Sequence, residues 1–185
     1  MDFETLIIKI AKILNKLRIP YFITGGYAVA VWGRLRATFD IDVVIEMFHP
    51  QVDKFAKEMR GLGKAVYIDE DMMSEALARR GEFNVIHPES GIKMDFFVAG
   101  VNPQGKQELA RARAYTIKEQ KVFFISPEDL ILSKLRWYQQ GGGERHLEDA
   151  QSVIKKSGKL LDDKYLKKQI SAQSLDELWM KIRKD

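Results

Sequence analysis

Two short motifs near the N-terminus contain the residue types that bind phosphate groups and metal ions. The first consists of Gly25 and Gly26, which follow an apolar run at residues 21–24 and precede a helical pattern at residues 27–32. A glycine turn at the start of a helix exposes backbone N–H groups, and the helix dipole there favours a phosphate oxygen. A tight connection between a strand and a helix also uses glycine, so the pair alone leaves both interpretations open.

The second motif is a pair of carboxylates, Asp40 and Asp42. Ile41, Val43 and Ile45 alternate with them in the period of a β-strand, so both carboxylates project from one face. Two neighbouring carboxylates repel each other unless water screens them or a cation lies between them. An exposed edge strand with ordinary surface acids is the alternative, but the glycine turn upstream favours a divalent metal site.

A third carboxylate, Asp95, interrupts the apolar strand pattern of residues 92–99. Because an unpaired carboxylate is costly to bury, Asp95 needs a partner or an outlet to solvent. Lys93 and Phe97 would share its face of the strand. A strand-end Asp that reaches solvent is the alternative interpretation, and Glu82 is a weaker candidate for a third acidic residue.

A strong helix start lies at Ser126, which is a favourable N-cap and is followed by Pro127 at the first helical position. Two acidic residues occupy the first turn, and the helical pattern extends to about residue 140, where three glycines follow. Lys134 lies beside the apolar face of this helix. On composition alone, a solvated surface lysine is the simplest interpretation of it.

The overall composition limits the kind of site that the chain can form. With 185 residues, of which 45% are hydrophobic, it can build one domain, or a domain with a small helical appendage. It has no cysteine, which excludes disulfides and thiolate zinc sites, and its three histidines lack ligand-like spacing. Any bound metal should therefore be a hard cation with oxygen ligands.

Charge and hydropathy suggest the environment and the partners. The formal net charge of +4 permits a polyanionic partner such as RNA but does not require one. Lysines between residues 155 and 168 could contact RNA, although solvated helix faces commonly look the same. The N-terminus does not resemble a signal peptide and no stretch is long and apolar enough to span a bilayer, so we expect a cytoplasmic protein with no membrane association.

The spacing of these motifs resembles the nucleotidyltransferase superfamily, which includes polymerase beta and many small bacterial and archaeal enzymes. The signature of that superfamily is a Gly-Gly or Gly-Ser turn, a short spacer, and then Asp-hydrophobic-Asp-hydrophobic. In this chain the three parts are residues 25–26, 27–39 and 40–43. The sequence around Arg36 and Thr38 is most similar to the branch that contains AbiEii-type toxins. The second turn residue is glycine, so a hydroxyl that touches phosphate in some members is missing.

The resemblance implies roles for individual residues. The implied catalytic and metal-binding residues are Asp40, Asp42 and Asp95. The implied nucleotide-binding residues are Gly25, Gly26, Arg36 and Lys134. The implied supporting residues are Thr38 and Asp149, the latter ordering the lysine from the next helix. The implied cofactor is Mg²⁺ or Mn²⁺, with a nucleoside triphosphate as the substrate.

The expected architecture is an α/β (α+β) protein of the nucleotidyltransferase fold. We predict a mixed sheet of about five strands flanked by helices, with residues 1–125 as the catalytic core. Residues 126–185 would form a helical C-terminal portion that completes the cleft. A hairpin is predicted around residues 88–91, a short strand at residues 65–68, and a polar connection at residues 102–115.

The predicted reaction moves a nucleoside monophosphate from the triphosphate to a hydroxyl acceptor, with release of pyrophosphate. RNA such as transfer RNA, a protein hydroxyl and a small molecule are all compatible acceptors. One alternative is a catalytically silent member that binds nucleotide or a protein partner, for example in a toxin–antitoxin pair. The other alternative is an unrelated metal-dependent nuclease, because Asp-X-Asp pairs also serve in phosphodiester cleavage.

Overall fold

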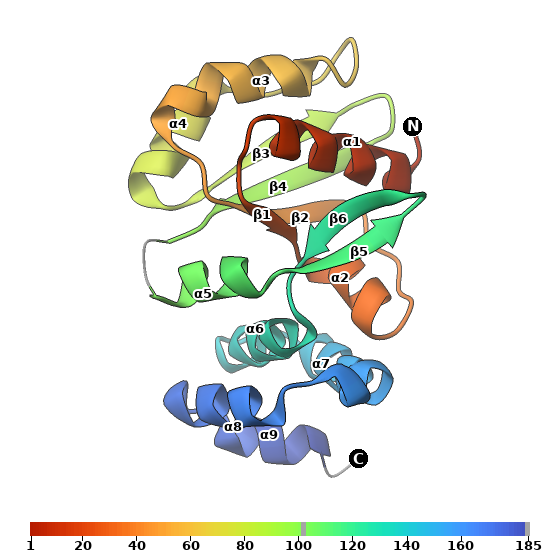
Figure 1. Ribbon diagram of the computed structural model, residues 1–185, viewed down its shortest axis with the longest axis vertical. Coiled ribbons are helices and arrows are strands. Elements are labelled where there is room, and N and C mark those ends of the chain that lie inside the picture. The colour runs from red at the N-terminus through yellow and green to blue at the C-terminus, as the bar shows by residue number, and fades with distance from the viewer. Residues whose placement is uncertain (101–102, 184–185) are drawn as a thin grey trace. The chain divides into compact units, whose positions relative to one another are not determined.

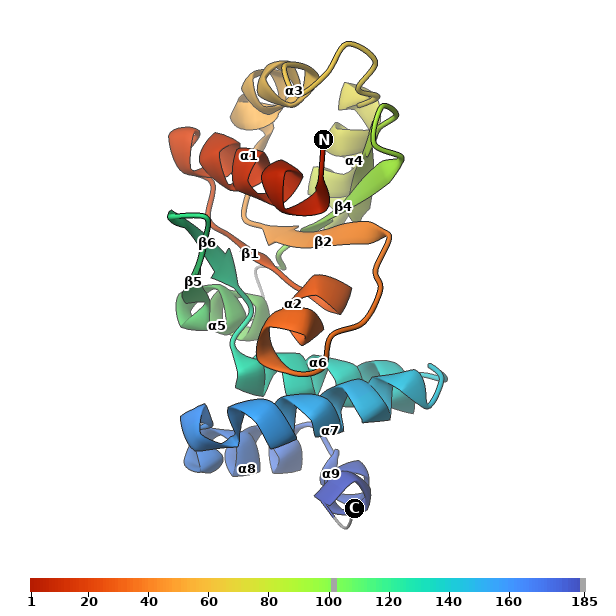
Figure 2. The same cartoon turned by 90° about the vertical axis from the view of Figure 1, so that its right-hand side faces the viewer.

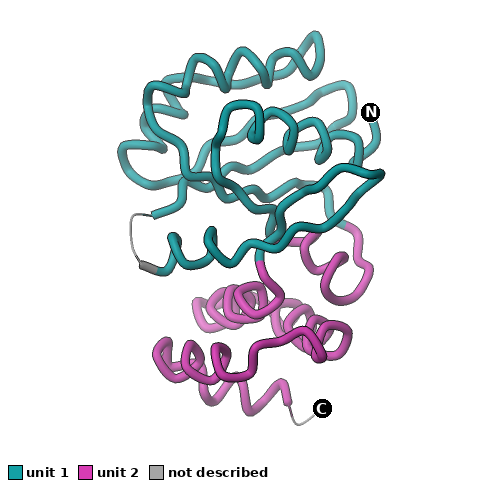
Figure 3. Tube along the Cα trace, viewed as in Figure 1, with its two compact units in different colours: residues 1–24, 38–125 teal, residues 25–37, 126–185 magenta. Residues whose placement is uncertain are grey.

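The computed structural model describes residues 1–100 and 103–183. Its contacts divide the chain into two compact units (Figure 3). Residues 1–24 and 38–125 form the sheet unit, and residues 25–37 and 126–185 form the helical unit. Local patterns do not indicate that residues 25–37 belong with the C-terminal helices, because this grouping depends on packing between distant segments.

The sheet unit is built on a mixed six-stranded sheet with the order β3-β4-β2-β1-β6-β5. The strands are β1 (Tyr21–Ile23), β2 (Asp40–Ile45), β3 (Glu82–His87), β4 (Ile92–Val98), β5 (Arg113–Ile117) and β6 (Gln120–Phe124). Two of the strand pairs, β2 with β4 and β1 with β6, are parallel, and the other three are antiparallel. The prediction of an α/β protein with a mixed sheet is confirmed, with six strands in place of about five.

Helices α1 (Phe3–Lys16), α3 (Val52–Arg60) and α4 (Glu70–Arg79) cover one face of this sheet (Figures 1 and 2). Asp2 caps α1 by accepting a hydrogen bond of 2.7 Å from the backbone N–H of Thr5. The apolar side of β3 and β4 packs beneath α3, where Phe83 and Phe96 stack with ring centroids 5.3 Å apart. Apolar side chains on this face therefore form a core, and the opposite face of β2 carries Asp40 and Asp42 together with the apolar Val44.

Two segments differ from the sequence prediction. The expected polar connection contains α5 (Pro103–Arg111) and strand β5, and its first residue, 102, lies outside the described residues. The turn between β5 and β6 places Lys118 and Glu119 at positive φ angles of 44° and 68°, a conformation usually signalled by glycine or asparagine. Without that signal the hairpin could not be recognised. The strand expected at residues 65–68 is reduced to a single bridge between Tyr67 and Ile86.

In the part of the chain that the structure describes, the helical unit contains five α-helices. They are α2 (Gly25–Trp32), α6 (Pro127–Gln139), α7 (Arg145–Ser157), α8 (Asp163–Ala172) and α9 (Asp176–Arg183). The predicted cap of α6 is confirmed, since the Ser126 hydroxyl accepts a hydrogen bond of 3.1 Å from the backbone N–H of Asp129. The Asp129 carboxylate also accepts a hydrogen bond from the Tyr165 hydroxyl, which ties α6 to α8. Within the described chain, no helix has both the length and the apolar character needed to cross a membrane.

Candidate functional site

The register of β2 and β4 brings the three predicted carboxylates together. Asp42 lies opposite Asp95, and Asp40 lies opposite Lys93, in this parallel pair. One carboxylate oxygen from each of Asp40, Asp42 and Asp95 lies within 4.8 Å of the other two, and all three residues are half-buried. Carboxylate oxygens at this separation suit a hard divalent cation such as Mg²⁺. Glu82, the weaker candidate for the third acid, lies on β3 opposite Phe97 of β4 and takes no part in this cluster.

Lys93 is the cation that accompanies this acidic cluster. Its Nζ lies 2.7 Å from Oδ2 of Asp95. The hydrogen bond to Asp95 is the main cause that raises the pKa of Lys93; burial lowers it, and the charges of Asp95, Asp40 and Asp42 raise it further. The lysine therefore stays protonated and partly offsets the repulsion among the three acids. The sequence placed Lys93 on the face of Asp95 but gave no reason to include it in the site.

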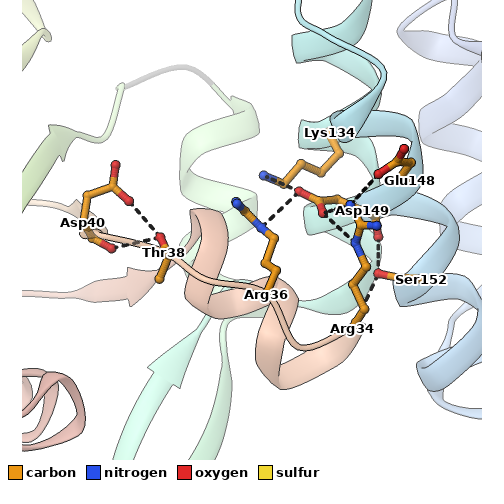
Figure 4. A network of polar contacts seen from close by, with 8 residues as sticks. All are labelled: Arg34, Arg36, Thr38, Asp40, Lys134, Glu148, Asp149 and Ser152. Carbon is orange, nitrogen blue, oxygen red and sulfur yellow. Dashed lines mark hydrogen bonds and ion pairs between the residues drawn. The ribbon is translucent and has the colours of Figure 1, made fainter.

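Thr38 fixes the orientation of the first carboxylate. Its hydroxyl donates a hydrogen bond of 2.8 Å to Oδ1 of Asp40 (Figure 4). A second, longer contact of 3.4 Å joins the same hydroxyl to the backbone carbonyl oxygen of Asp40. The hydroxyl therefore binds Oδ1 of Asp40 and makes no hydrogen bond to Oδ2.

The glycine turn lies where the sequence predicts it. Strand β1 ends at Ile23, and helix α2 begins at Gly25, whose φ angle of 62° is strained for residues with a Cβ atom. Gly26 is buried, and the first turn of α2 contains no acidic side chain. The first backbone N–H groups of a helix lack intrahelical partners, so this turn has the geometry of an anion site.

A second polar cluster lies within the helical unit, around the carboxylate of Asp149 (Figure 4). Asp149 is only 1% exposed, and three cationic side chains point toward it, two from the segment between α2 and β2 and one from α6. The distances are 3.2 Å from Arg34 Nη2, 3.5 Å from Arg36 Nε and 3.5 Å from Lys134 Nζ. The predicted residues Arg36, Lys134 and Asp149 thus meet at one point. Lys134 is 6% exposed, so it is not a solvated surface lysine.

Arg34 completes this cluster, and the sequence did not identify it. Its guanidinium donates a hydrogen bond of 2.7 Å to Glu148 and a longer one to Asp149. The hydrogen bond to Glu148 is the main reason that the pKa of Arg34 lies above its ordinary value. The backbone N–H of Arg34 donates to the Ser152 hydroxyl, which fixes the chain directly before Arg36. With two carboxylates for three cations, the cluster has one positive charge in excess.

Part of the basic stretch between residues 155 and 168, for which RNA contact was one interpretation, is used in packing. Lys156 donates hydrogen bonds to the carbonyl oxygens of Ala30 and Val31 in the last turn of α2. A cation at this end of a helix is favourable because it satisfies free carbonyl groups and complements the dipole. Ser157 donates to the carbonyl oxygen of Trp32 in the same way. The remaining lysines lie on exposed helix faces, and RNA contact there stays a prediction.

Comparison with known proteins places these two clusters in a family context. The family model described as "Nucleotidyl transferase of unknown function (DUF2204)" matches residues 3–183. The chain belongs to this nucleotidyl transferase family. The resemblance to the nucleotidyltransferase superfamily, drawn above from the glycine turn and the acidic motif, is thereby confirmed. No curated protein matches the chain.

Solved structures of other nucleotidyltransferases share the fold. A nucleotidyltransferase-like protein from Paracoccidioides brasiliensis is 23% identical, with a TM-score of 0.57 over 82% of this chain and 74% of its own. ANT(2")-Ia, solved with adenylyl-2"-tobramycin, is 17% identical, with a TM-score of 0.56 over 98% of this chain and 97% of its own. The lincosamide adenylyltransferase LnuA, solved with lincomycin, is 16% identical, with a TM-score of 0.54 over 83% and 96% respectively. At these identities the likeness establishes a common fold.

Proposed function

We propose that this nucleotidyl transferase moves a nucleoside monophosphate from a nucleoside triphosphate to a hydroxyl acceptor and releases pyrophosphate. The observation that carries the proposal is the meeting of Asp40, Asp42 and Asp95, whose oxygens lie within 4.8 Å of one another on adjacent parallel strands. Family membership supports nucleotidyl transfer in general. Beyond this general activity, we propose the metal, the roles of the individual residues and the class of acceptor.

The three carboxylates fit Mg²⁺ or Mn²⁺ in number, donor type and spacing. They offer oxygen ligands only, and three negative charges side by side favour binding of a divalent cation. A bound metal would stabilise the negative charge that develops on the transferring phosphoryl group. Lys93 holds Oδ2 of Asp95 in place when no metal is bound, and it would compete with a metal for this carboxylate.

The triphosphate would be held by groups of the helical unit. Backbone N–H groups at Gly25 and Gly26 would donate hydrogen bonds to phosphate oxygens at the start of α2. Arg36 and Lys134 would offset the charge on the leaving pyrophosphate. Each of them lies 3.5 Å from Asp149, which is the distance of an ion pair and not of a short hydrogen bond. Arg36 Nε has no hydrogen-bond partner within the described chain. Asp149 thus positions both cations without using all of their hydrogen-bond donors.

The reaction would proceed as a displacement at the α-phosphorus. Asp95 accepts the proton of the attacking hydroxyl as the new bond forms between that oxygen and the α-phosphorus. The bond from the α-phosphorus to the bridging oxygen breaks, and pyrophosphate carries away that electron pair. Two of the solved relatives were determined with antibiotic compounds, adenylyl-2"-tobramycin in one and lincomycin in the other, so small hydroxyl compounds are candidate acceptors beside RNA.

The proposal is tested by offering the protein each of the four triphosphates labelled at the α-phosphate, with MgCl₂ and a cell extract. We expect label to enter an RNA, protein or small-molecule fraction, and an equal amount of pyrophosphate to form. Nucleic-acid fragments without pyrophosphate would instead indicate a nuclease. Tight binding of a triphosphate without any labelled product would indicate a silent member of the family. Either result would contradict the proposed transfer.

A further inference from the structure

An aromatic stack lies one helical turn beyond the Lys134–Asp149 ion pair, within the same helical unit. The rings of Trp137 on α6 and His146 on α7 are stacked with centroids 6.2 Å apart and an interplanar angle of 13°. Trp137 is nevertheless 54% exposed, so much of the indole faces solvent. The stack therefore offers a fixed aromatic surface next to a cationic site.

The position of the stack follows from the spacing on both helices. Trp137 lies three residues after Lys134, and Asp149 lies three residues after His146. Residues three apart on a helix are neighbours on one face, about 5–6 Å apart between Cβ atoms. The two helices are thus joined by two adjacent contacts, the ion pair of Lys134 with Asp149 and the stack of Trp137 with His146.

The turn after α6 holds the histidine ring in place. A Cβ atom built at Gly142 would lie 2.7 Å from Cδ2 of His146 and 2.6 Å from the carbonyl oxygen of Trp137. Only glycine therefore fits between the end of α6 and the imidazole. Nδ1 of His146 is buried and makes no hydrogen bond within the described chain, so packing rather than hydrogen bonding positions the ring.

The imidazole of His146 is neutral at physiological pH. Burial is the main cause that lowers its pKa from the ordinary value of 6.5, and the nearby charges of Lys134 and Arg145 lower it further, against the effect of Asp149. A neutral imidazole stacks as an aromatic ring without adding charge.

We infer that the exposed face of Trp137, supported from behind by His146, is the platform on which the base of the nucleoside triphosphate stacks. The inference rests on the proposed function and adds the binding of the base to it. Indole surfaces bind nucleobases through their π faces with little sequence preference. A purine has two rings to place on the indole, so ATP and GTP should gain more from the platform than CTP and UTP.

Charge and spacing favour a nucleotide as the occupant. Lys134 lies three residues before Trp137 on α6, and the exposed Arg145 directly precedes His146 on α7, so both helices carry a cation near the stack. This suits a ligand that combines an aromatic ring with negative charge. In a nucleotide the ribose separates the base from the phosphates. A base on Trp137 would therefore leave the phosphates free to reach the Asp149 cluster one helical turn away.

Equilibrium binding of ATP and of inorganic tripolyphosphate, each with MgCl₂, tests this platform. Trp137→Ala should weaken ATP binding by about tenfold, the order expected for loss of one base–aromatic stack, and leave tripolyphosphate binding unchanged. Trp137→Phe keeps an aromatic face and should lie between the alanine variant and the wild type. Trp179→Ala is the matched control, since Trp179 is in the same unit but packs against Arg183 on α9.

Several results would overturn the inference. Unchanged ATP binding by Trp137→Ala would show that Trp137 does not bind the base, and it would not contradict the proposed function. Equal weakening for ATP and tripolyphosphate would show that Trp137 acts on structure rather than on the base. If Trp137→Ala bound oligoadenylate more weakly but ATP as well as the wild type does, the stack would bind an RNA acceptor and not the base of the triphosphate. If the wild type bound neither ATP nor tripolyphosphate, the proposed function would fail together with the platform.

Discussion

Asp42 on β2 and Asp95 on β4 are partners in the register of a parallel strand pair, although 53 positions separate them along the chain, from 42 to 95. Asp40 precedes Asp42 by two residues and lies opposite Lys93, so the two strands bring three acids and one lysine to the same face of the sheet. The concentration of negative charge there has consequences for stability as well as for metal binding.

Replacing Asp42 by Asn should leave the metal-free protein at least as stable as the wild type. The amide keeps the shape of the side chain and removes one of three mutually repelling charges, while Lys93 retains its partner Asp95. Thermal unfolding in EDTA should give an equal or higher Tm for Asp42→Asn. Added MgCl₂ should raise the Tm of the wild type and have little effect on the variant. A Tm several degrees lower in EDTA would show that the carboxylate is needed for folding.

Replacing Lys93 by Met should have opposite effects on the apo protein and on metal affinity. Without metal, the three acids lose their cation, so the Tm in EDTA should fall. With metal, no ammonium group competes for Asp95, so Mg²⁺ should bind more tightly by isothermal titration. Lys121→Met, at an exposed position of β6, is the control and should change neither quantity. Weaker Mg²⁺ binding by Lys93→Met would contradict this account.

Replacing Asp149 by Asn should be strongly destabilising. The carboxylate is 1% exposed and is the common partner of Arg34, Arg36 and Lys134. Its loss leaves these cations close together and should lower the free energy of unfolding by about 3 kcal/mol, measured by urea denaturation. Glu148→Gln is a matched control, because Glu148 binds Arg34 at an exposed position, and it should cost about 0.5 kcal/mol. Similar values for the two variants would show that burial of Asp149 has no special role.

The half-buried His146 should make stability depend on pH. Its pKa is lowered in the folded protein, chiefly by burial, so the unfolded chain binds the proton more readily. The contribution of His146 is fully present above its ordinary value of 6.5 and declines as the pH falls below that value. His146→Phe keeps a ring without a titrating group, so its Tm should fall less than that of the wild type from pH 7.5 to about 5.5. Parallel pH profiles for the two proteins would exclude this role for His146.

Local patterns were sufficient to predict the central features of the fold. The period of two in β2 placed Asp40 and Asp42 on one face, and the register with β4 agrees with that placement. The cap at Ser126 placed the start of α6 correctly, because it depends on residues within one turn. The positive φ angle of Gly25 similarly agrees with a turn that requires glycine.

The remaining features depend on contacts that no local pattern records. Arg34 and Asp149 are 115 positions apart, so nothing near Arg34 identifies its partner. The hairpin of β5 and β6 lacks the glycine or asparagine that usually marks its turn. The stack of Trp137 on His146 depends on how α6 packs against α7, and the helical period alone places neither ring.

The most direct test of the central claim is the rate at which labelled nucleoside monophosphate moves to acceptor in the presence of MgCl₂, compared for the wild type and Asp42→Asn. We expect the variant to be slower by about a hundredfold or more, the size found when one group that stabilises transition-state charge is removed. Its Tm in EDTA should match or exceed that of the wild type, so the loss cannot be ascribed to unfolding. Transfer by Asp42→Asn at the wild-type rate would show that the carboxylate cluster of β2 and β4 is not the catalytic site.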